Sequence, residues 1–226
     1  MGAAAVGGRV TDAPTIGVFG GTFDPIHVAH LAVAEAARDA LGLERVLFVP
    51  NRQPPHKPDQ RVTPAADRLA MVQAAIEGNP AFETSTIEID RDGPSYTSDT
   101  LATLRADRLA SGPAGTSGDL ALILSVEALA GLATWHEPAR VLELATLVVA
   151  PRDGSPDLDA ETIARLVPGA NARVVMLDGP RMRLSASEIR ARAAAGRSLR
   201  YLVPDAVAAY IGDHALYTQP RRMDRS

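Results

Sequence analysis

The feature that most constrains the fold is residues 120–124, a run in which every residue is apolar. A strand with one face in water alternates apolar and polar residues, so a continuous apolar run predicts a strand covered on both faces. Five further segments predict strands, although residues 82–89 show only an irregular alternation. The five are residues 15–19, 46–49, 82–89, 147–150 and 174–177.

Segments with helical spacing lie between these strands. One begins near Val28 and ends at Gly42, and its apolar face holds Leu31, Ala34, Ala37 and Leu41. A second begins at Pro64, with Leu69, Val72 and Ile76 as its apolar stripe. Three more helices are predicted over residues 98–110, 185–195 and 204–211.

Alternation of strands and helices at these spacings predicts a Rossmann-like α/β fold, a doubly wound parallel sheet with helices on both faces in a single domain. We expect this domain to span residues 14–218, between a disordered extension of residues 1–13 and a flexible tail of residues 219–226. Ligands of such sheets bind beyond the carboxyl ends of the strands, where the strand order reverses. Residues that follow the first, fourth and sixth strands are therefore the candidates for function.

Composition excludes several classes of protein. The chain has 23 Lys and Arg against 27 Asp and Glu, with no basic stripe, which disfavours binding to nucleic acid. It has no cysteine, which excludes disulfides, a cysteine-ligated metal and a thiol nucleophile. The absence of a long apolar run and of a secretory signal predicts a cytoplasmic protein without a membrane segment.

The loop after the first strand carries the first candidate site. Gly20 and Gly21 allow backbone to approach a ligand, and a helix N-terminus then favours a phosphate. His27 and His30 are three residues apart at that helix start, so both rings can lie on one face. Two histidines can also be half of a metal site, but no third ligand stands at suitable spacing, and we expect no protein-held metal. The loop matches neither a Walker A motif nor Gly-x-Gly-x-x-Gly.

A second candidate follows the sixth strand and has two interpretations. Ser185 with Glu188 three residues later is typical of a capping box, with Arg190 as a surface cation. Alternatively, the hydroxyl groups of Ser185 and Ser187 and the helix amides hold the β- and γ-phosphates of a nucleotide, and Arg190 clamps them.

The two segments together resemble the motifs of the nucleotidyltransferase superfamily that carries His-x-x-His after its first strand. Members usually have Gly before the second histidine, where this chain has Ala29. The segment from Leu184 to Arg190 is similar to the Ile-Ser-x-Ser/Thr-x-Ile-Arg motif of adenylyltransferases in this superfamily. With both motifs present, the phosphate-binding interpretation is favoured over simple capping.

Further segments resemble bacterial nicotinate-nucleotide adenylyltransferases. Residues 94–101 look like their Pro-Ser-Tyr-Thr-x-x-Thr-Leu segment, and residues 54–57 like their loop after the second strand. Trp135-His136 and residues 201–217 match two later segments, so that the resemblance spans roughly residues 15–218. It implies transfer of the adenylyl group of ATP to nicotinate mononucleotide in NAD biosynthesis, with Mg²⁺ carried by ATP. A homodimer or a higher homo-oligomer is compatible with it.

The resemblance also implies a role for each site residue. Four residues would act on the reacting phosphates: His27, His30, Lys57 and Arg190. ATP would be bound by Gly20, Gly21, Thr22, Phe23, Ser185, Ser187 and Arg190. The acceptor would be bound by Tyr96, Thr97, Glu127, Trp135 and His136. As the one Trp of the chain, Trp135 can instead be a core residue.

One segment departs from the family pattern. Where Gly-x-Asp is usual after the fourth strand, this chain has Ser125-Val126-Glu127. The departure leaves two alternatives open: an adenylyl- or cytidylyltransferase with another phosphorylated acceptor, and a weakly active or inactive nucleotide-binding protein.

Overall fold

A single parallel sheet organises the molecule. The computed structural model describes residues 16–52, 62–111, 118–151, 153–154, 159–167 and 173–218. Its six strands are paired in the order β3-β2-β1-β4-β5-β6, and every pair is parallel. The strands are β1 (Ile16–Gly21), β2 (Arg45–Pro50), β3 (Phe82–Thr84), β4 (Leu120–Ser125), β5 (Ala145–Ala150) and β6 (Val174–Met176).

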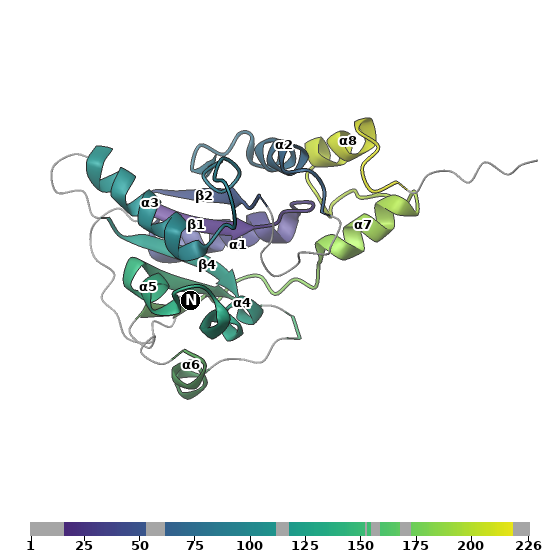
Figure 1. Cartoon of the computed structure of the whole chain (residues 1–226). Helices are drawn as coiled ribbons and strands as arrows, with labels where there is room; N and C mark the ends of the chain where they lie inside the picture. The colour runs from purple at the N-terminus through teal and green to yellow at the C-terminus, as the bar shows by residue number, and fades with distance from the viewer. Residues whose placement is uncertain are drawn as a thin grey trace, which may run out of the picture.

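Helices cover both faces of this sheet (Figure 1), as the continuous apolar runs predict. One face packs against α1 (Val28–Leu41), α2 (Ala65–Ile76), α7 (Ala186–Ala194) and α8 (Asp205–Asp213). The other packs against α3 (Thr97–Ser111), α4 (Val126–Ala130), α5 (Pro138–Leu144) and α6 (Ala160–Leu166), with the 3-10 turn η1 (Leu132–Thr134) beside α4. The doubly wound fold is therefore confirmed.

Side chains of each central strand alternate between the two cores. In β2, Val46 and Phe48 enter the core under α1 and α2, while Leu47 and Val49 enter the core under α3. This alternation explains why the strand is apolar throughout.

Helix α1 follows its predicted pattern. Ala34 and Ala37 are fully buried, and Leu31 and Leu41 pack beside them at the edge of the core. Gly42 ends the helix in the left-handed conformation, with φ 61°, and its N–H bonds to the carbonyl oxygen of Arg38. A glycine reaches this conformation without strain.

Two predictions about local structure are wrong. The strand predicted over residues 82–89 ends at Thr84, because the chain turns at Thr86, whose side chain and carbonyl oxygen both bond to Asp90. In α2, Val72 and Ile76 are buried as predicted, but Leu69 is only partly buried; the buried positions beside them are Met71 and, unexpectedly, Arg68.

Three short helices, α4, α5 and α6, were not predicted from the sequence. Each has five to seven residues, too few to repeat a helical pattern of apolar spacing. Their caps are nevertheless visible in the sequence once the structure is known: Ser125 begins α4, Pro138 is the first residue of α5, and Asp159 begins α6.

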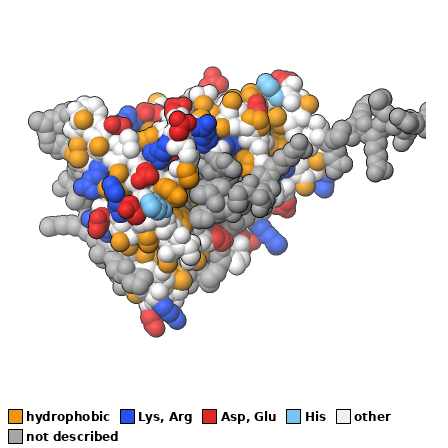
Figure 2. Space-filling model, in the orientation of Figure 1, with side chains coloured by type: hydrophobic (Ala, Val, Ile, Leu, Met, Phe, Trp, Pro, Cys, Tyr) orange, Lys and Arg blue, Asp and Glu red, His pale blue; other side chains and the backbone are white. Residues whose placement is uncertain are grey.

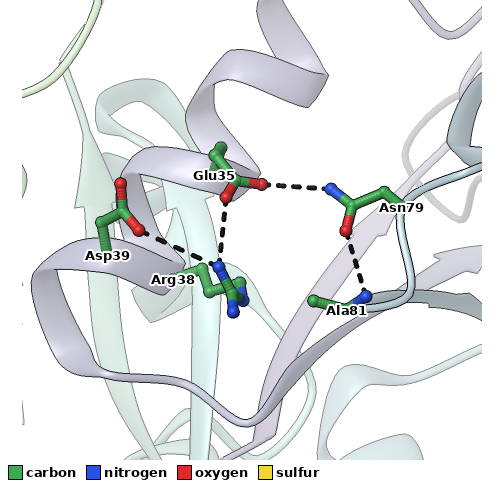
Figure 3. A network of polar contacts seen from close by, with 5 residues as sticks. All are labelled: Glu35, Arg38, Asp39, Asn79 and Ala81. Atoms are coloured by element: carbon green, nitrogen blue, oxygen red, sulfur yellow. Dashed lines mark hydrogen bonds and ion pairs between the residues drawn. The ribbon is translucent and has the colours of Figure 1, made fainter.

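A network of hydrogen bonds and ion pairs links α1 to the turn before β3 (Figure 3). Asn79 donates from Nδ2 to Glu35 Oε2 at 3.2 Å and accepts the N–H of Ala81 on Oδ1 at 3.0 Å. Arg38 donates to Glu35 Oε1 at 3.2 Å. Each carboxylate oxygen of Glu35 therefore accepts a hydrogen bond, and the network links α1 to the residues just before β3.

Replacing Asn79 with alanine is expected to lower the free energy of unfolding by about 1–2 kcal/mol, the scale of a part-buried amide that loses its partners. Urea unfolding measures this change. Glu35→Gln is the matched control, since its amide oxygen still accepts from Asn79, and it should cost less than about 0.5 kcal/mol. An equal loss in the two variants would contradict a role of Asn79 in holding the turn.

Charges are mixed on the surface shown in Figure 2. Arg side chains are interspersed with Asp and Glu over the described residues of this face and do not gather into a basic patch. None of the helices in the described part of the chain combines the length and apolar character that crossing a membrane requires.

Candidate active site

The reversal of strand order lies between β1 and β4. Strand β2 follows β1 on one side and β5 follows β4 on the other, so the connections leaving β1 and β4 diverge to opposite faces. Such a point opens a crevice at the carboxyl ends of the strands. The loop of residues 22–27 leaves β1 here, and Ser125 ends β4 beside it.

The two histidines of the first loop lie together. Their rings stack with centroids 3.7 Å apart and an angle of 23° between the planes. His27 is 6% exposed and His30 is partly exposed, so the pair lies at the surface edge of the core. The prediction that both rings share one face is confirmed.

A backbone contact fixes the tautomer of His30. The N–H of His27 donates to His30 Nδ1 at 3.2 Å, so Nδ1 carries no proton and Nε2 carries one. An imidazole held this way presents Nε2–H as a donor, which suits charge that builds up on a phosphate oxygen.

The amides at the start of α1 are less available than expected. Val28 N–H donates to the carbonyl oxygen of Leu202 at 3.1 Å, and His30 N–H to that of His27 at 2.9 Å. With the N–H of His27 on His30 Nδ1, three of the four amides over residues 27–30 have protein partners. Most of the amides at this helix start therefore bond within the protein and are less available to a phosphate than free helix N–H groups would be.

The paired glycines have different roles. Gly20 is exposed, and a Cβ built on it would meet nothing within 4 Å, so its surface is open to a ligand. A Cβ on Gly21 would lie 2.9 Å from the ring of Phe23. Gly21 is therefore required by packing within the protein. Phe23, predicted to bind ATP, is 3% exposed, and its ring packs against His30 and Phe48. Its side chain therefore contacts His30 from within the core.

The late serine-containing segment meets this loop. Arg190 of α7 donates from Nη1 to the carbonyl oxygen of Asp24 at 2.7 Å, across 166 positions of sequence. Its Nη2 donates to Ser187 Oγ at 3.1 Å. Two distant motifs thus lie at one end of the sheet (Figure 1), as predicted.

The two serines of that segment are used differently. Ser185 caps α7, with Oγ accepting the N–H of Glu188 at 3.2 Å, so the capping interpretation holds for this residue. Ser187 is exposed and orients Arg190. Ser187 thus contacts Arg190, which bonds to the loop after β1, whereas Ser185 stabilises the start of its own helix.

Two of the predicted acceptor residues lie in contact. Tyr96, just before α3, stacks on His136 with ring centroids 4.2 Å apart. Thr97 is the first residue of α3, where the positive end of the helix dipole favours an anion. Trp135 is partly exposed and packs one side against the core under α3 and α5, so it combines a core contact with an accessible edge.

A buried carboxyl group positions the segment before α3. Glu88 is 8% exposed, and burial raises the pKa of its carboxyl group above the ordinary value. Its Oε1 accepts from Thr100 at 2.9 Å, and its carbonyl oxygen accepts from Ser95 at 3.4 Å. Glu88 was not singled out from the sequence, because nothing in its neighbours shows that the chain turns inward there.

The unusual segment after β4 has a structural explanation. Ser125 Oγ accepts the N–H of Ala128 at 3.2 Å and so begins α4. The side chain folds onto its own helix instead of projecting toward a ligand. Glu127 is exposed in the first turn of that helix, where its charge is favourable to the helix dipole.

Arg68 is a second residue of the site region that sequence analysis missed. It is completely buried and donates to the carbonyl oxygens of Thr22 and Asn51, both at 2.7 Å, and of Arg52 and Thr63. Burial lowers its pKa, and the nearby carboxylate of Asp24 opposes that shift. Its guanidinium group ties the loops after β1 and β2 to the start of α2. The sequence signal that could have identified Arg68 is the position of an arginine on the apolar face of a helix.

Lys57, predicted to act on the phosphates, lies outside the described residues, as do residues 1–13 and 219–226. Within the described ranges there is no group of three or more His, Cys, Asp or Glu side chains that could hold a metal ion.

Comparison with known proteins identifies the family. The sequence model described as "Cytidylyltransferase-like" matches residues 18–192. A protein of Thermomicrobium roseum named "Probable nicotinate-nucleotide adenylyltransferase" is 46% identical over 89% of this chain and 91% of its own length. The chain belongs to the nicotinate-nucleotide adenylyltransferase family within the cytidylyltransferase-like proteins. A family member of the same name from Salinibacter ruber is 44% identical over 90% of this chain and 97% of its own.

Solved structures agree on the fold. The nicotinic acid mononucleotide adenylyltransferase of Plasmodium falciparum, complexed with NaAD, superposes with a TM-score of 0.71 at 18% identity. The superposition covers 90% of this chain and 97% of that one. The family assignment made from the motifs and the fold class are both confirmed.

Proposed function

We propose that this chain transfers the adenylyl group of ATP to nicotinate mononucleotide, giving nicotinate adenine dinucleotide and pyrophosphate. The observation that supports the proposal is the bond from Arg190 to the carbonyl oxygen of Asp24, which joins α7 to the loop that carries the histidine pair. The family relationship supports the same activity, because relatives carrying this name are up to 46% identical over nearly their whole length.

The proposed reaction is an in-line displacement. An anionic phosphate oxygen of the mononucleotide attacks the α-phosphorus of ATP, the bond from that phosphorus to the bridging oxygen breaks, and pyrophosphate leaves. The attacking oxygen carries no proton, so no general base is required. Catalysis then consists of positioning and of stabilising charge on phosphate oxygens.

The residues that the motifs indicate have the following roles in this scheme. His30, with a proton on Nε2, and His27 would donate to the α-phosphate, and Arg190 would neutralise the departing pyrophosphate, joined by Lys57. Gly20 leaves room for the triphosphate to approach the backbone after β1. Mg²⁺ would arrive with ATP as part of the substrate, bound mainly by nucleotide oxygens.

The acceptor side should favour an acid over an amide. The start of α3 at Thr97 presents backbone donors and a positive dipole end, which attract a carboxylate. A carboxamide would turn an NH₂ group toward donors and lose part of this interaction. The pyridine ring would stack on Trp135.

The test uses purified protein with MgATP and either nicotinate or nicotinamide mononucleotide. We expect dinucleotide and pyrophosphate to form in equal amounts, and faster with the acid. Dinucleotide formed only with a different phosphorylated acceptor or with CTP would assign another member of the superfamily. Binding of ATP in calorimetry without pyrophosphate release from any mononucleotide would identify a nucleotide-binding protein without activity.

Replacing Trp135 with alanine should raise the KM for the mononucleotide on the order of 10-fold, the scale of one lost aromatic stacking contact. The KM for ATP should change by less than about twofold if the indole contacts the acceptor alone. Tyr201→Ala is the control, since this ring is 82% exposed and lies away from the core. Equal changes in both KM values for Trp135→Ala would show that Trp135 acts as a packing residue.

The proposal includes a cytoplasmic location, where ATP is available to the enzyme. Fractionation of cells that produce the full chain tests this part separately from the activity.

A further inference from the structure

The backbone and side chain of Asp24 join four parts of the chain. The residue follows β1 and is 5% exposed. Its carboxylate accepts the phenol O–H of Tyr217 on Oδ1 at 2.7 Å and the N–H of Thr63 on Oδ2 at 3.3 Å. Its carbonyl oxygen accepts from Arg190 at 2.7 Å. The conformation of Asp24 therefore decides where the guanidinium group of Arg190 lies.

Tyr217 comes from the turn after α8 and is held firmly. The N–H of Leu216 bonds to the carbonyl oxygen of Ile211 at 3.0 Å, which closes that turn. Tyr217 has φ 63°, a left-handed conformation that is strained for an aromatic residue and persists only when its surroundings fix it. Burial, followed by the hydrogen bond to Asp24 and the charge of that carboxylate, raises the pKa of the phenol well above its ordinary value. The group is thus a permanent donor to Asp24.

Arg190 also lies near enough to Tyr217 for its charge to oppose the rise in the pKa of that phenol. Among the described residues, its other hydrogen bond is to Ser187 Oγ, an exposed hydroxyl group on the same helix. A long flexible side chain loses positional precision when one of two contacts is weakened. The Asp24 carbonyl oxygen is the contact that comes from the loop of the histidine pair, so it sets the distance between the clamp and that pair.

We propose that Tyr217 is a positioning residue for adenylyl transfer. It fixes the loop at Asp24, and through the Asp24 carbonyl oxygen it sets Arg190 beside His27 and His30. The C-terminal turn thereby becomes part of the active site without touching substrate. The inference rests on the proposed function, since Arg190 must act on the phosphates for its position to matter.

The chain supplies a matched control. Tyr210, seven residues earlier and on α8, donates its phenol O–H to Asp67 Oδ1 at 2.9 Å and thereby joins α8 to α2. Tyr210→Phe and Tyr217→Phe each remove one phenol-to-carboxylate hydrogen bond between the C-terminal segment and the rest of the protein. Only the second bond leads to Arg190.

The experiment compares the two variants in the full chain with MgATP and nicotinate mononucleotide. We expect Tyr217→Phe to lower kcat by about 10-fold, as for a small misplacement of a charge-stabilising group, with the KM for the mononucleotide unchanged within about twofold. Tyr210→Phe should leave kcat within about twofold, because its bond serves packing alone. Urea midpoints of both variants separate loss of stability from loss of turnover.

A double-mutant cycle tests whether the effect passes through Arg190. In an Arg190→Ala background, Tyr217→Phe should change kcat by less than about twofold, since the group it positions is gone. A 10-fold loss in that background, or an equal kcat for Tyr217→Phe and wild type, would overturn the proposal. If wild type forms no dinucleotide, the proposed function fails instead, so the two failures are distinguishable.

A second pair of variants covers the case in which Tyr217→Phe does not fold. Asp24→Asn keeps an oxygen that accepts from Tyr217 but weakens this bond by removing charge. It also removes a negative charge near the buried Arg68, and the urea midpoint of the variant measures that loss of stability separately from kcat. It should lower kcat by roughly 3- to 10-fold, whereas Asp67→Asn, the same change at the control carboxylate, should stay within about twofold. Equal kcat values for these two variants would overturn the positioning role.

Discussion

His30→Ala is expected to lower kcat by about 10²–10³-fold, the cost of losing one preoriented donor to charge developing in the transition state. The structure gives the physical reason. His30 Nδ1 accepts the N–H of His27, so the ring cannot rotate freely and its Nε2–H is already directed when ATP binds. The stacked ring of His27 and the edge contact with Phe23, at 5.2 Å between centroids, limit the ring further.

Initial rates of pyrophosphate release under saturating MgATP measure this effect, and calorimetry shows whether ATP still binds. His214→Ala is the matched control, because His214 is exposed and stacks on Tyr210 at 3.9 Å, outside the loop after β1. It should keep kcat within about twofold. Near-wild-type turnover of His30→Ala would refute the role given to the histidine pair.

Arg68→Met is expected to produce the largest loss of stability, about 3–5 kcal/mol, as when one partner of a buried charged network is removed. Four of the acceptors of Arg68 are backbone carbonyl oxygens, of Thr22, Asn51, Arg52 and Thr63, and no side-chain change can remove these; the other is Asn51 Oδ1, at 3.4 Å. They would stay buried without their donors. The carboxylate of Asp24 would also lose the nearby positive charge.

Urea unfolding with an unchanged m value measures this loss. Arg38→Met is the matched control: the same substitution on α1 removes contacts with Glu35 and Asp39, whose side chains are 44% and 74% exposed. Such surface pairs are worth less than about 1 kcal/mol. If the two variants had similar midpoints, Arg68 would not be the joint between the loops after β1 and β2.

Most of the fold could be predicted because its signals are local. The apolar runs of β2, β4 and β5 and the Ala and Leu stripe of α1 carry their periodicity in a few neighbouring residues. The wrong part of β3 shows where this fails: residues 82–89 alternate like a strand, yet the bonds between Thr86 and Asp90 close a turn. Hydrogen bonds from a side chain can hold the backbone in a turn where a strand would otherwise form, and they produce no periodic pattern in the sequence.

The sequence named candidate residues of the site, but it did not show the contacts that hold them in place. His27 stacks on His30, Arg190 bonds to Ser187 and to Asp24 of the loop that carries the histidines, and Tyr96 stacks on His136. The sequence could not show that the ring of Phe23 leaves no room for a side chain at Gly21. Nor could it show that the carbonyl oxygen of Leu202 accepts a hydrogen bond from an amide of α1. Both depend on which atoms come within contact distance after the chain has folded.

By itself the sequence determined the alternation of strands and helices, the coverage of both sheet faces and the two motifs that mark the ends of β1 and β6. The tertiary structure alone decided that Asp24 receives bonds from Thr63, Arg190 and Tyr217, and that Arg68 is buried among carbonyl oxygens. The reason is that periodicity is a property of neighbours along the chain, whereas these contacts join residues up to 193 positions apart. Such contacts follow from the order in which parallel strands are placed, which no local pattern encodes.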